Sequence, residues 1–224
     1  MREGSAGGGK GLGSVKSVKA SVIVASSAAK PITQISTESV ASRSTKVAEF
    51  DRVLGGGLVP GAVVLLSGEP GVGKSTLLLE VAAKTAQTGA KVLYVSGEES
   101  VGQIRLRAER TGALSDNLYL ASETDLANVL GQVESVKPEL LVVDSVQTIA
   151  HAEIDGAAGM PSQIREVATN LIRLAKENNL PVILVGHVTK DGNIAGPRAL
   201  EHLVDVVCHF EGDRQTSLRF VRSL

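Results

Sequence analysis

Eight consecutive residues have the types and the spacing needed to bind phosphate. Residues 68–75 read Gly-Glu-Pro-Gly-Val-Gly-Lys-Ser, which matches the phosphate-loop pattern G-x-x-x-x-G-K-[ST]. Glycines in such a loop let backbone N–H groups point at phosphate oxygens, and a following helix adds the positive end of its dipole. We therefore expect Lys74 to reach the β- and γ-phosphates of ATP and the Ser75 hydroxyl to bind Mg²⁺.

The flanking residues decide whether this match is more than chance in a chain with 24 glycines. Residues 62–66 are all apolar and predict a buried strand before the loop, and residues 77–83 predict a helix that ends at Gly89. Strand, glycine loop and helix is the order that phosphate binding requires, so we interpret the match as genuine. The residues assigned to the phosphates are Gly68, Glu69, Pro70, Gly71, Val72, Gly73, Lys74, Ser75 and Thr76.

An aspartate at the end of a second apolar strand is the candidate metal partner of Ser75. Asp144 directly follows the run Leu-Leu-Val-Val at 140–143. Its carboxylate would hold Mg²⁺ beside Ser75, largely through water. An aspartate in this position could instead cap the next segment of the chain.

Hydrolysis also needs a group that orients or deprotonates the attacking water. Glu98 and Glu99 follow a strand predicted at 91–95, which in this topology can lie beside the strand of the phosphate loop. We choose Glu98 as the catalytic carboxylate and keep Glu99 as the alternative. Both could instead be charges that a helix N-terminus favours.

Further polar candidates follow the later strands. His187 ends the strand predicted at 182–186, where it could sense the γ-phosphate or serve as a hydrogen-bonded structural residue, and Gln147 is a weaker candidate. Lys190 and Arg198 lie in a glycine-rich loop. They could contact a nucleic-acid backbone or a phosphate bound by a neighbouring subunit, or the loop could simply be solvated.

The elements that position these residues alternate between strands and helices, which predicts an α/β domain with a mostly parallel sheet covered on both faces. Ligands of such sheets bind beyond the carboxyl ends of the strands, where the candidate residues lie. A capping box of Ser100 and Gln103 predicts one helix start. The other predicted elements are helices at 47–54, 100–110, 126–136 and 164–174, a strand at 118–120, and a terminal hairpin of 204–210 and 217–221.

Composition sets limits on the class of protein. The 224 residues are 43% hydrophobic and carry a net charge of −1, so the chain as a whole is not a basic nucleic-acid binder and any contact with DNA must be local. Three phenylalanines, two tyrosines and no tryptophan argue against recognition by base stacking. The single cysteine, Cys208, excludes an intrachain disulfide and a CxxC zinc site, and favours a cytoplasmic location.

The first 30 residues differ in composition from the rest of the chain. Residues 1–30 are rich in glycine, serine, alanine and lysine, which predicts a flexible tail or linker. We expect the folded domain to occupy residues 31–224. No apolar stretch approaches the roughly 20 residues of a membrane span, and no secretory signal is evident.

Several segments together resemble the bacterial RadA family (also called Sms) of the RecA/KaiC superfamily. The similarity covers about residues 31–224 and is specific, whereas the phosphate loop alone would indicate only the superfamily. The segments are FDRVLGGGLVPG at 50–61, YVSGEES at 94–100, VDSVQ at 143–147, VGHVTKDG at 185–192 and GPRALEH at 196–202.

The resemblance implies a RecA-like P-loop NTPase core that acts as a DNA-dependent ATPase in recombination and repair. Members form hexameric rings, move along single-stranded DNA and promote branch migration with RecA. The resemblance assigns ATP phosphate binding to 68–76, the Walker B aspartate to Asp144 and the catalytic carboxylate to Glu98. It makes 151–163 and 189–199 the DNA-facing loops, with Lys190 and Arg198 as DNA or inter-subunit contacts.

The chain departs from the family pattern in three places. The family's N-terminal four-cysteine zinc module, its C-terminal Lon-protease-like domain and its Lys-Asn-Arg-Phe-Gly motif do not occur in the sequence. We therefore expect an isolated ATPase core in which nucleotide binding survives. A nucleotide-gated ring-assembly module with little turnover, like KaiC, is the alternative. A small-molecule kinase fits less well, because no arginine-rich lid segment is present.

Overall fold

The computed structural model describes residues 30–34, 41–187, 198–212 and 218–224. The chain divides into two compact units, residues 1–36 and 37–224. The described part of the first unit is one 3₁₀ turn, η2 (Ile32–Gln34). Lys190 and most of its predicted loop lie outside the described residues, as does the turn of the terminal hairpin.

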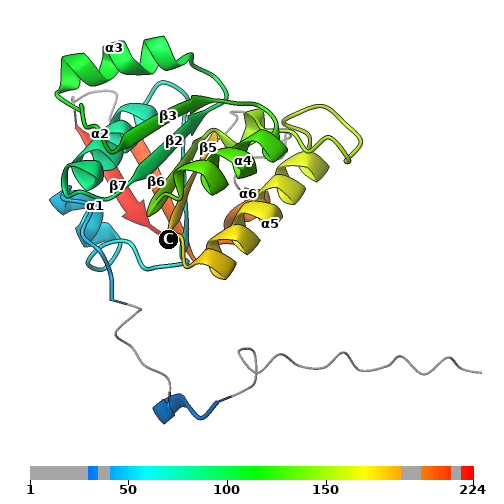
Figure 1. The fold of residues 1–224 in the computed structure, drawn as a ribbon, viewed down its shortest axis with the longest axis horizontal. Helices are drawn as coiled ribbons and strands as arrows, with labels where there is room; N and C mark the ends of the chain where they lie inside the picture. The colour runs from blue at the N-terminus through cyan, green and yellow to red at the C-terminus, as the bar shows by residue number, and fades with distance from the viewer. Residues whose placement is uncertain (1–29, 35–40, 188–197, 213–217) are drawn as a thin grey trace, which may run out of the picture. The chain divides into compact units, whose positions relative to one another are not determined.

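A seven-stranded sheet runs through the second unit in the order β3-β2-β4-β5-β1-β6-β7 (Figure 1). All neighbouring strands pair in parallel except β6 and β7, which form the antiparallel terminal hairpin. This arrangement confirms the predicted mostly parallel sheet with its terminal hairpin. The strands are β1 (Val63–Gly68), β2 (Val92–Ser96), β3 (Leu118–Ser122), β4 (Leu140–Asp144), β5 (Val182–His187), β6 (Val206–Gly212) and β7 (Arg219–Ser223).

The strand before Glu98 does not lie beside the phosphate-loop strand, a position that the sequence pattern allowed. β4 and β5 separate β2 from β1, which pairs with β5 and β6 instead. The reason is topological. The chain moves outward from β1 through β2 to β3 with helices on one face, and then returns to β4 and β5 with helices on the other face. The returning strands fill the space between β1 and β2, and this change of direction creates the crevice where ligands bind in such sheets.

Helices cover both faces of this sheet. Residues of the first three helices pack into one apolar cluster and residues of the last three into another, so each group covers its own face (Figure 1). The helices are α1 (Ala48–Val53), α2 (Lys74–Gln87), α3 (Val101–Thr111), α4 (Leu126–Val136), α5 (Pro161–Asn178) and α6 (Arg198–Glu201). A 3₁₀ turn, η4 (Val146–Thr148), follows β4.

Local sequence explains where two of these helices begin. The predicted capping box is present at α3, because Ser100 Oγ accepts from Gln103 N while Gln103 Oε1 accepts from Ser100 N at 2.9 Å. α5 begins at Pro161, three residues before the predicted periodicity starts. Proline suits the first turn of a helix because its missing N–H would have no partner there.

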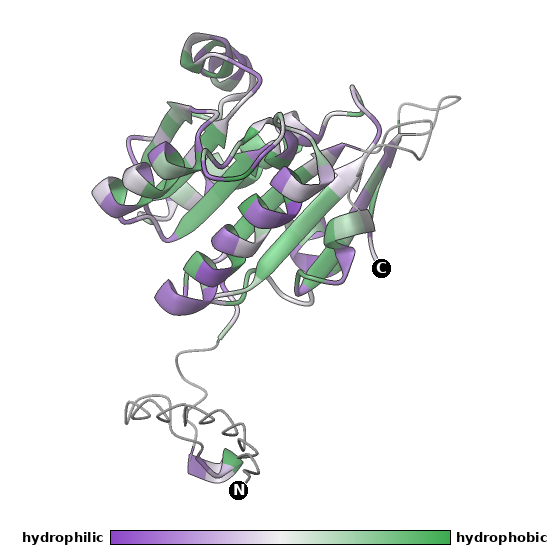
Figure 2. Cartoon of the chain, turned by 90° about the vertical axis from the view of Figure 1, so that its right-hand side faces the viewer, coloured by the Kyte–Doolittle hydropathy of each residue, from purple (hydrophilic) through white to green (hydrophobic). Residues whose placement is uncertain are grey.

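The core consists of two apolar layers, one on each face of the sheet. Alternate residues of β1 belong to different layers, with Val64 and Leu66 in one and Val63 and Leu65 in the other. Figure 2 shows hydrophobic strands between helices whose hydrophilic residues lie away from the sheet. None of the helices in the described ranges is both long enough and apolar enough to cross a membrane.

Candidate nucleotide-binding site

The predicted phosphate loop joins the carboxyl end of β1 to the first residue of α2. Gly73 is the N-cap of α2 and has a φ of 107°, a backbone conformation that strains any residue with a side chain. Gly68 ends β1, and a Cβ there would clash with the carbonyl oxygen of Phe210 on β6. The glycines therefore allow both the sharp turn into the helix and the close approach of the neighbouring strand.

Lys74 lies within the loop that precedes it. Its Nζ donates to the carbonyl oxygens of Gly68 at 2.8 Å and Glu69 at 2.9 Å, and the residue is 3% exposed. Burial lowers the pKa of Lys74, while the charges of Asp144 and Glu98 act in the opposite direction. A buried ammonium group at the N-terminus of α2 is an arrangement that favours an anion.

Asp144 is the last residue of β4 and is 3% exposed. Its Oδ2 accepts a hydrogen bond from the Tyr94 hydroxyl at 2.6 Å. Burial and the charge of Asp144 raise the pKa of Tyr94 well above its ordinary value, so the tyrosine remains a donor. The following turn, η4, has Ser145 as its N-cap residue and no side-chain cap hydrogen bond.

Glu98 links the ends of three strands. Its Oε1 accepts from Ser145 Oγ at 2.8 Å and lies 2.9 Å from His187 Nε2. His187 Nδ1 is buried without a partner among the described residues. An ionised carboxylate can only accept, so this contact is a hydrogen bond that the ring donates through Nε2–H to Glu98.

Glu99 has different surroundings, although it is adjacent in sequence. It forms an ion pair with Arg107 of α3, with Nη1 and Oε1 2.6 Å apart. Gln147 lies near His187, whose backbone oxygen accepts from Gln147 Nε2 at 3.3 Å. Glu98 and His187 thus meet at the carboxyl ends of the strands, while Glu99 is bound to α3.

The donor set suits Mg²⁺ held jointly with a nucleotide. Within the part of the chain that the structure describes, no three His, Cys, Asp or Glu residues come together to hold a metal ion by themselves. Mg²⁺ is usually bound by one or two carboxylates together with water and substrate phosphates. Ser75 would supply a hydroxyl and Asp144 a carboxylate to such a site.

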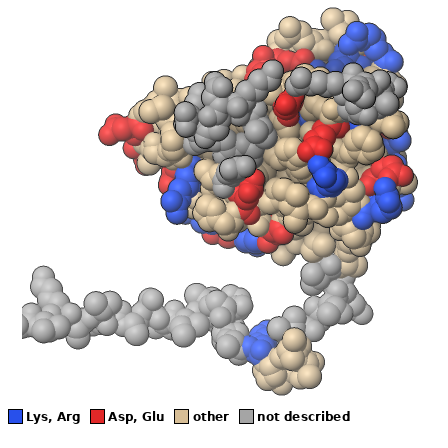
Figure 3. All heavy atoms as spheres, turned by 180° about the vertical axis from the view of Figure 1, so that it is seen from behind, with Lys and Arg blue, Asp and Glu red and all other residues tan. Residues whose placement is uncertain are grey.

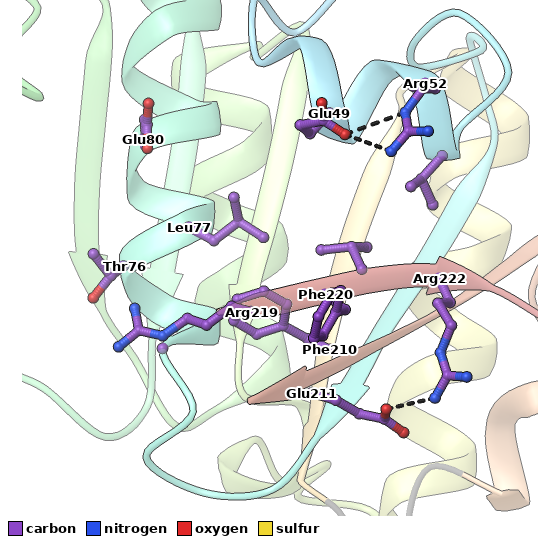
Figure 4. Close-up of a pocket in the computed structure, with 13 residues that line it drawn as sticks. Glu49, Arg52, Thr76, Leu77, Glu80, Phe210, Glu211, Arg219, Phe220 and Arg222 are labelled. Carbon is purple, nitrogen blue, oxygen red and sulfur yellow. Dashed lines mark hydrogen bonds and ion pairs between the residues drawn. The ribbon is translucent and has the colours of Figure 1, made fainter. Parts of the chain in front are cut away.

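The structure adds three residues that sequence analysis did not select. Tyr94 lies inside the apolar strand β2. The only feature of the sequence that could have pointed to it is its hydroxyl group, two residues before the end of the strand. Ser145 follows Asp144 directly. Arg219 comes from β7 and lies beside the loop (Figure 4), with Nη1 3.0 Å from where a Cβ on Gly73 would be. Of the predicted DNA or inter-subunit residues, Arg198 is the first residue of α6 and Lys190 is not described.

Comparison with known proteins gives a consistent result. Residues 29–193 match the family model described as AAA domain. The chain is 59% identical over 206 residues to the DNA repair protein RadA of Mycolicibacterium smegmatis, covering 90% of the chain and 44% of that relative. It is 48% identical over 210 residues to the protein of the same name from Streptococcus pneumoniae, covering 94% of the chain and 50% of the relative.

A third relative, the DNA repair protein RadA of Listeria monocytogenes, is 52% identical over 198 residues, which are 88% of the chain and 43% of the relative. The chain thus spans about half the length of the curated relatives it matches. These similarities confirm the resemblance to RadA that the motifs indicate. Together with the phosphate loop at the end of β1, they show that the chain belongs to the AAA domain family.

Proposed function

We propose that the chain is the ATP-hydrolysing core of a DNA-repair motor. The observation that carries the proposal is the contact of Glu98 with Ser145 and His187, which gathers a carboxylate from β2 with the ends of β4 and β5. Asp144 and the phosphate loop lie at the same edge of the sheet. The name of the relatives, DNA repair protein RadA, supports the choice of DNA repair.

In this proposal each side chain has a separate task. Residues 68–76 bind the phosphates of ATP, and Lys74 exchanges its loop carbonyls for β- and γ-phosphate oxygens. Ser75 and Asp144 hold Mg²⁺, which neutralises phosphate charge when bound. Glu98 orients the attacking water and accepts its proton. His187 contacts Glu98 through one end of its ring. In this proposal it senses whether the γ-phosphate is present, and its movement shifts the loop that follows β5.

Single-stranded DNA is the proposed activator. The two loops that could contact it, residues 151–163 and 189–199, differ in charge. Residues 151–160 contain Glu153 and Asp155 but no lysine or arginine. Gln163, which is 1% exposed, holds this loop by donating to three of its carbonyl oxygens. The loop at 189–199 instead contains Lys190 and Arg198, which suit phosphate contacts. We therefore assign the DNA backbone, or a neighbouring subunit, to the second loop.

Surface charge agrees with a local DNA contact. On the face seen in Figure 3, acidic and basic side chains are interspersed among uncharged residues. With a net charge of −1, the chain offers no general attraction for DNA. We further propose that the protein containing this core assembles as a hexameric ring in the cytoplasm and promotes branch migration together with RecA.

The test is ATP turnover with and without single-stranded DNA, measured on this chain and on the longer protein that contains it. We expect DNA to raise turnover of the longer protein, and the effect to weaken as salt rises. Lys74→Ala should abolish nucleotide binding or turnover in both. Turnover that DNA leaves unchanged would refute the motor. ATP-dependent assembly without turnover would favour the KaiC-like alternative.

A further inference from the structure

We propose that Tyr94 is a positioning residue for Asp144: its hydroxyl fixes one carboxylate oxygen and leaves the other for Mg²⁺ or a water bound to it. The hydroxyl donates to Asp144 Oδ2 at 2.6 Å. The inference rests on the proposed ATP site, in which Asp144 and Ser75 hold Mg²⁺ together with the nucleotide. It names the residue that sets how well Asp144 does so.

The register of the sheet brings the two side chains together. In the neighbouring parallel strands β2 and β4, Tyr94 pairs with Val142 and Ser96 pairs with Asp144. Asp144 lies two residues after Val142, so it is on the same face of the sheet as Tyr94. The tyrosine ring belongs to the same apolar cluster as Val142. Its length carries the hydroxyl along this face to the carboxylate at the end of β4.

Burial makes this hydrogen bond hold both groups in place. Tyr94 is fully buried and Asp144 is 3% exposed, so water has little access to either group. Among the described residues, the carboxylate is the one hydrogen-bond partner of the hydroxyl. Rotation of Asp144 away from Tyr94 would leave a buried O–H without an acceptor, which is costly. The carboxylate is therefore kept in one orientation.

Packing alone does not account for the hydroxyl. β2 is apolar before Ser96, and the neighbours of Tyr94 in the strand are Leu93 and Val95. A phenylalanine would fill the space of the ring equally well, and it would avoid the cost of taking a polar group out of water. A tyrosine is favourable in a core where its O–H has a partner, and here that partner is the candidate metal residue.

The hydrogen bond orients Asp144 without neutralising it. In the described part of the chain Asp144 forms no ion pair, and Lys74 donates to the carbonyl oxygens of Gly68 and Glu69 instead. A neutral donor on Oδ2 keeps the carboxylate charge available to a cation. Groups that hydrogen-bond the carboxylate ligand of a metal orient it, and replacing them commonly weakens metal binding roughly ten- to a hundredfold.

The test is the gain in nucleotide affinity that Mg²⁺ provides. The dissociation constant of a non-hydrolysable ATP analogue is measured on the whole chain, with saturating Mg²⁺ and again with EDTA. Tyr94→Phe should reduce the Mg²⁺-dependent gain about tenfold, the lower end of that range, because Asp144 holds the metal largely through water. Affinity in EDTA should stay within about twofold of wild type, since the phosphate loop is unchanged.

Two further variants show whether Tyr94 acts through Asp144. Asp144→Asn keeps an acceptor for the hydroxyl but removes the charge, so it should reduce the gain at least as much. Tyr94→Phe should then add less loss than it causes alone. Tyr119→Phe is the matched control, because it removes the hydroxyl of the chain's other tyrosine, which is 38% exposed and pairs with Leu93 on the opposite face. It should change neither constant.

An equal loss of affinity with Mg²⁺ and with EDTA in Tyr94→Phe would overturn the proposal, because the hydroxyl would then only stabilise the fold. A Mg²⁺-dependent gain that Tyr94→Phe leaves unchanged would overturn it as well. Failure of the wild-type chain to bind the analogue under either condition would instead refute the ATP site itself.

Discussion

Glu98 and Glu99 are adjacent residues with separate surroundings, and this decides which one suits catalysis. Glu98 contacts Ser145 and His187 at the strand ends, whereas Glu99 is paired with Arg107. Only one oxygen of Glu98 takes part in these two contacts, which leaves Oε2 for a water molecule. A carboxylate fixed at one oxygen is oriented without being neutralised, as a general base requires.

Glu98→Gln should therefore leave ATP binding within a few-fold of wild type and slow hydrolysis by about a hundredfold or more, because the amide cannot accept the proton. Single-turnover hydrolysis and nucleotide titration measure the two effects separately. Glu99→Gln is the matched control, and it should retain most of the hydrolysis. If Glu99→Gln slows hydrolysis and Glu98→Gln does not, the assignment of the two residues is reversed.

At the scale of elements, a close contact holds the segment after β2 against η4. A Cβ on Gly97 would come within 2.7 Å of the Thr148 Cβ and closer still to its hydroxyl. Thr148 Oγ1 also donates to the Ser145 carbonyl oxygen at 2.7 Å. The position of Glu98 relative to Ser145 thus depends on the small size of Gly97.

Gly97→Ala should lower the free energy of unfolding by about 1–3 kcal/mol, the usual effect of overpacking. Thr148→Ala removes the hydroxyl oxygen, the closest of the clashing atoms, and keeps the Cβ, so the double variant should be less destabilised than the sum of the two single variants. Urea unfolding of all four proteins measures this coupling. Additive losses would show that Gly97 and Thr148 do not share a contact.

The entry of the chain into α1 depends on the carboxylate of Asp51. Its Oδ1 accepts from the backbone N–H and hydroxyl of Thr45 at 2.8 and 2.7 Å, and its Oδ2 accepts from Ser44 Oγ at 2.7 Å. Partial burial by itself raises the pKa of Asp51, but these hydrogen bonds to the charged form outweigh it and lower the pKa overall.

The lowered pKa of Asp51 predicts a pH dependence of stability. The hydrogen bonds contribute fully above the ordinary aspartate pKa of about 4, and their contribution disappears as the pH falls through the lowered value. Asp51→Asn should therefore cost about 1 kcal/mol at pH 7 and progressively less below pH 4. Urea unfolding from pH 7 to pH 3 tests this, with Glu134→Gln as an exposed control. A constant difference at all pH values would contradict the assignment.

For the molecule as a whole, local patterns predicted the elements, and long-range contacts were harder to predict. The apolar run at 140–143 and the Ser100 capping box are local signals, so they identified β4 and the start of α3. The separation of β1 from β2 depends on how two layers of helices pack, which periodicity does not reveal. Arg219 lies beside Gly73 of the phosphate loop, 146 positions earlier in the chain. No residue pattern in either segment predicts that the two are close in space.

The rate at which a thiol reagent labels Cys208 reports how often the folded molecule opens. It is fully buried on β6 beside Leu66 of β1, and burial raises the pKa of its thiol to about 11. Because the reactive form is the thiolate, only about one thiol in a thousand would be reactive at pH 8 even if reagent could enter. Labelling should therefore require β6 to separate from the core.

We expect a thiol reagent to label the native chain orders of magnitude more slowly than the urea-unfolded chain at the same pH. Leu66→Ala should speed native labelling at least tenfold, because core truncations of this kind cost about 2–5 kcal/mol. ADP should slow labelling as its concentration rises above its dissociation constant, since a ligand that binds the folded state stabilises it. Fast labelling that neither Leu66→Ala nor ADP alters would show that the hairpin opens independently of the core and the phosphate loop.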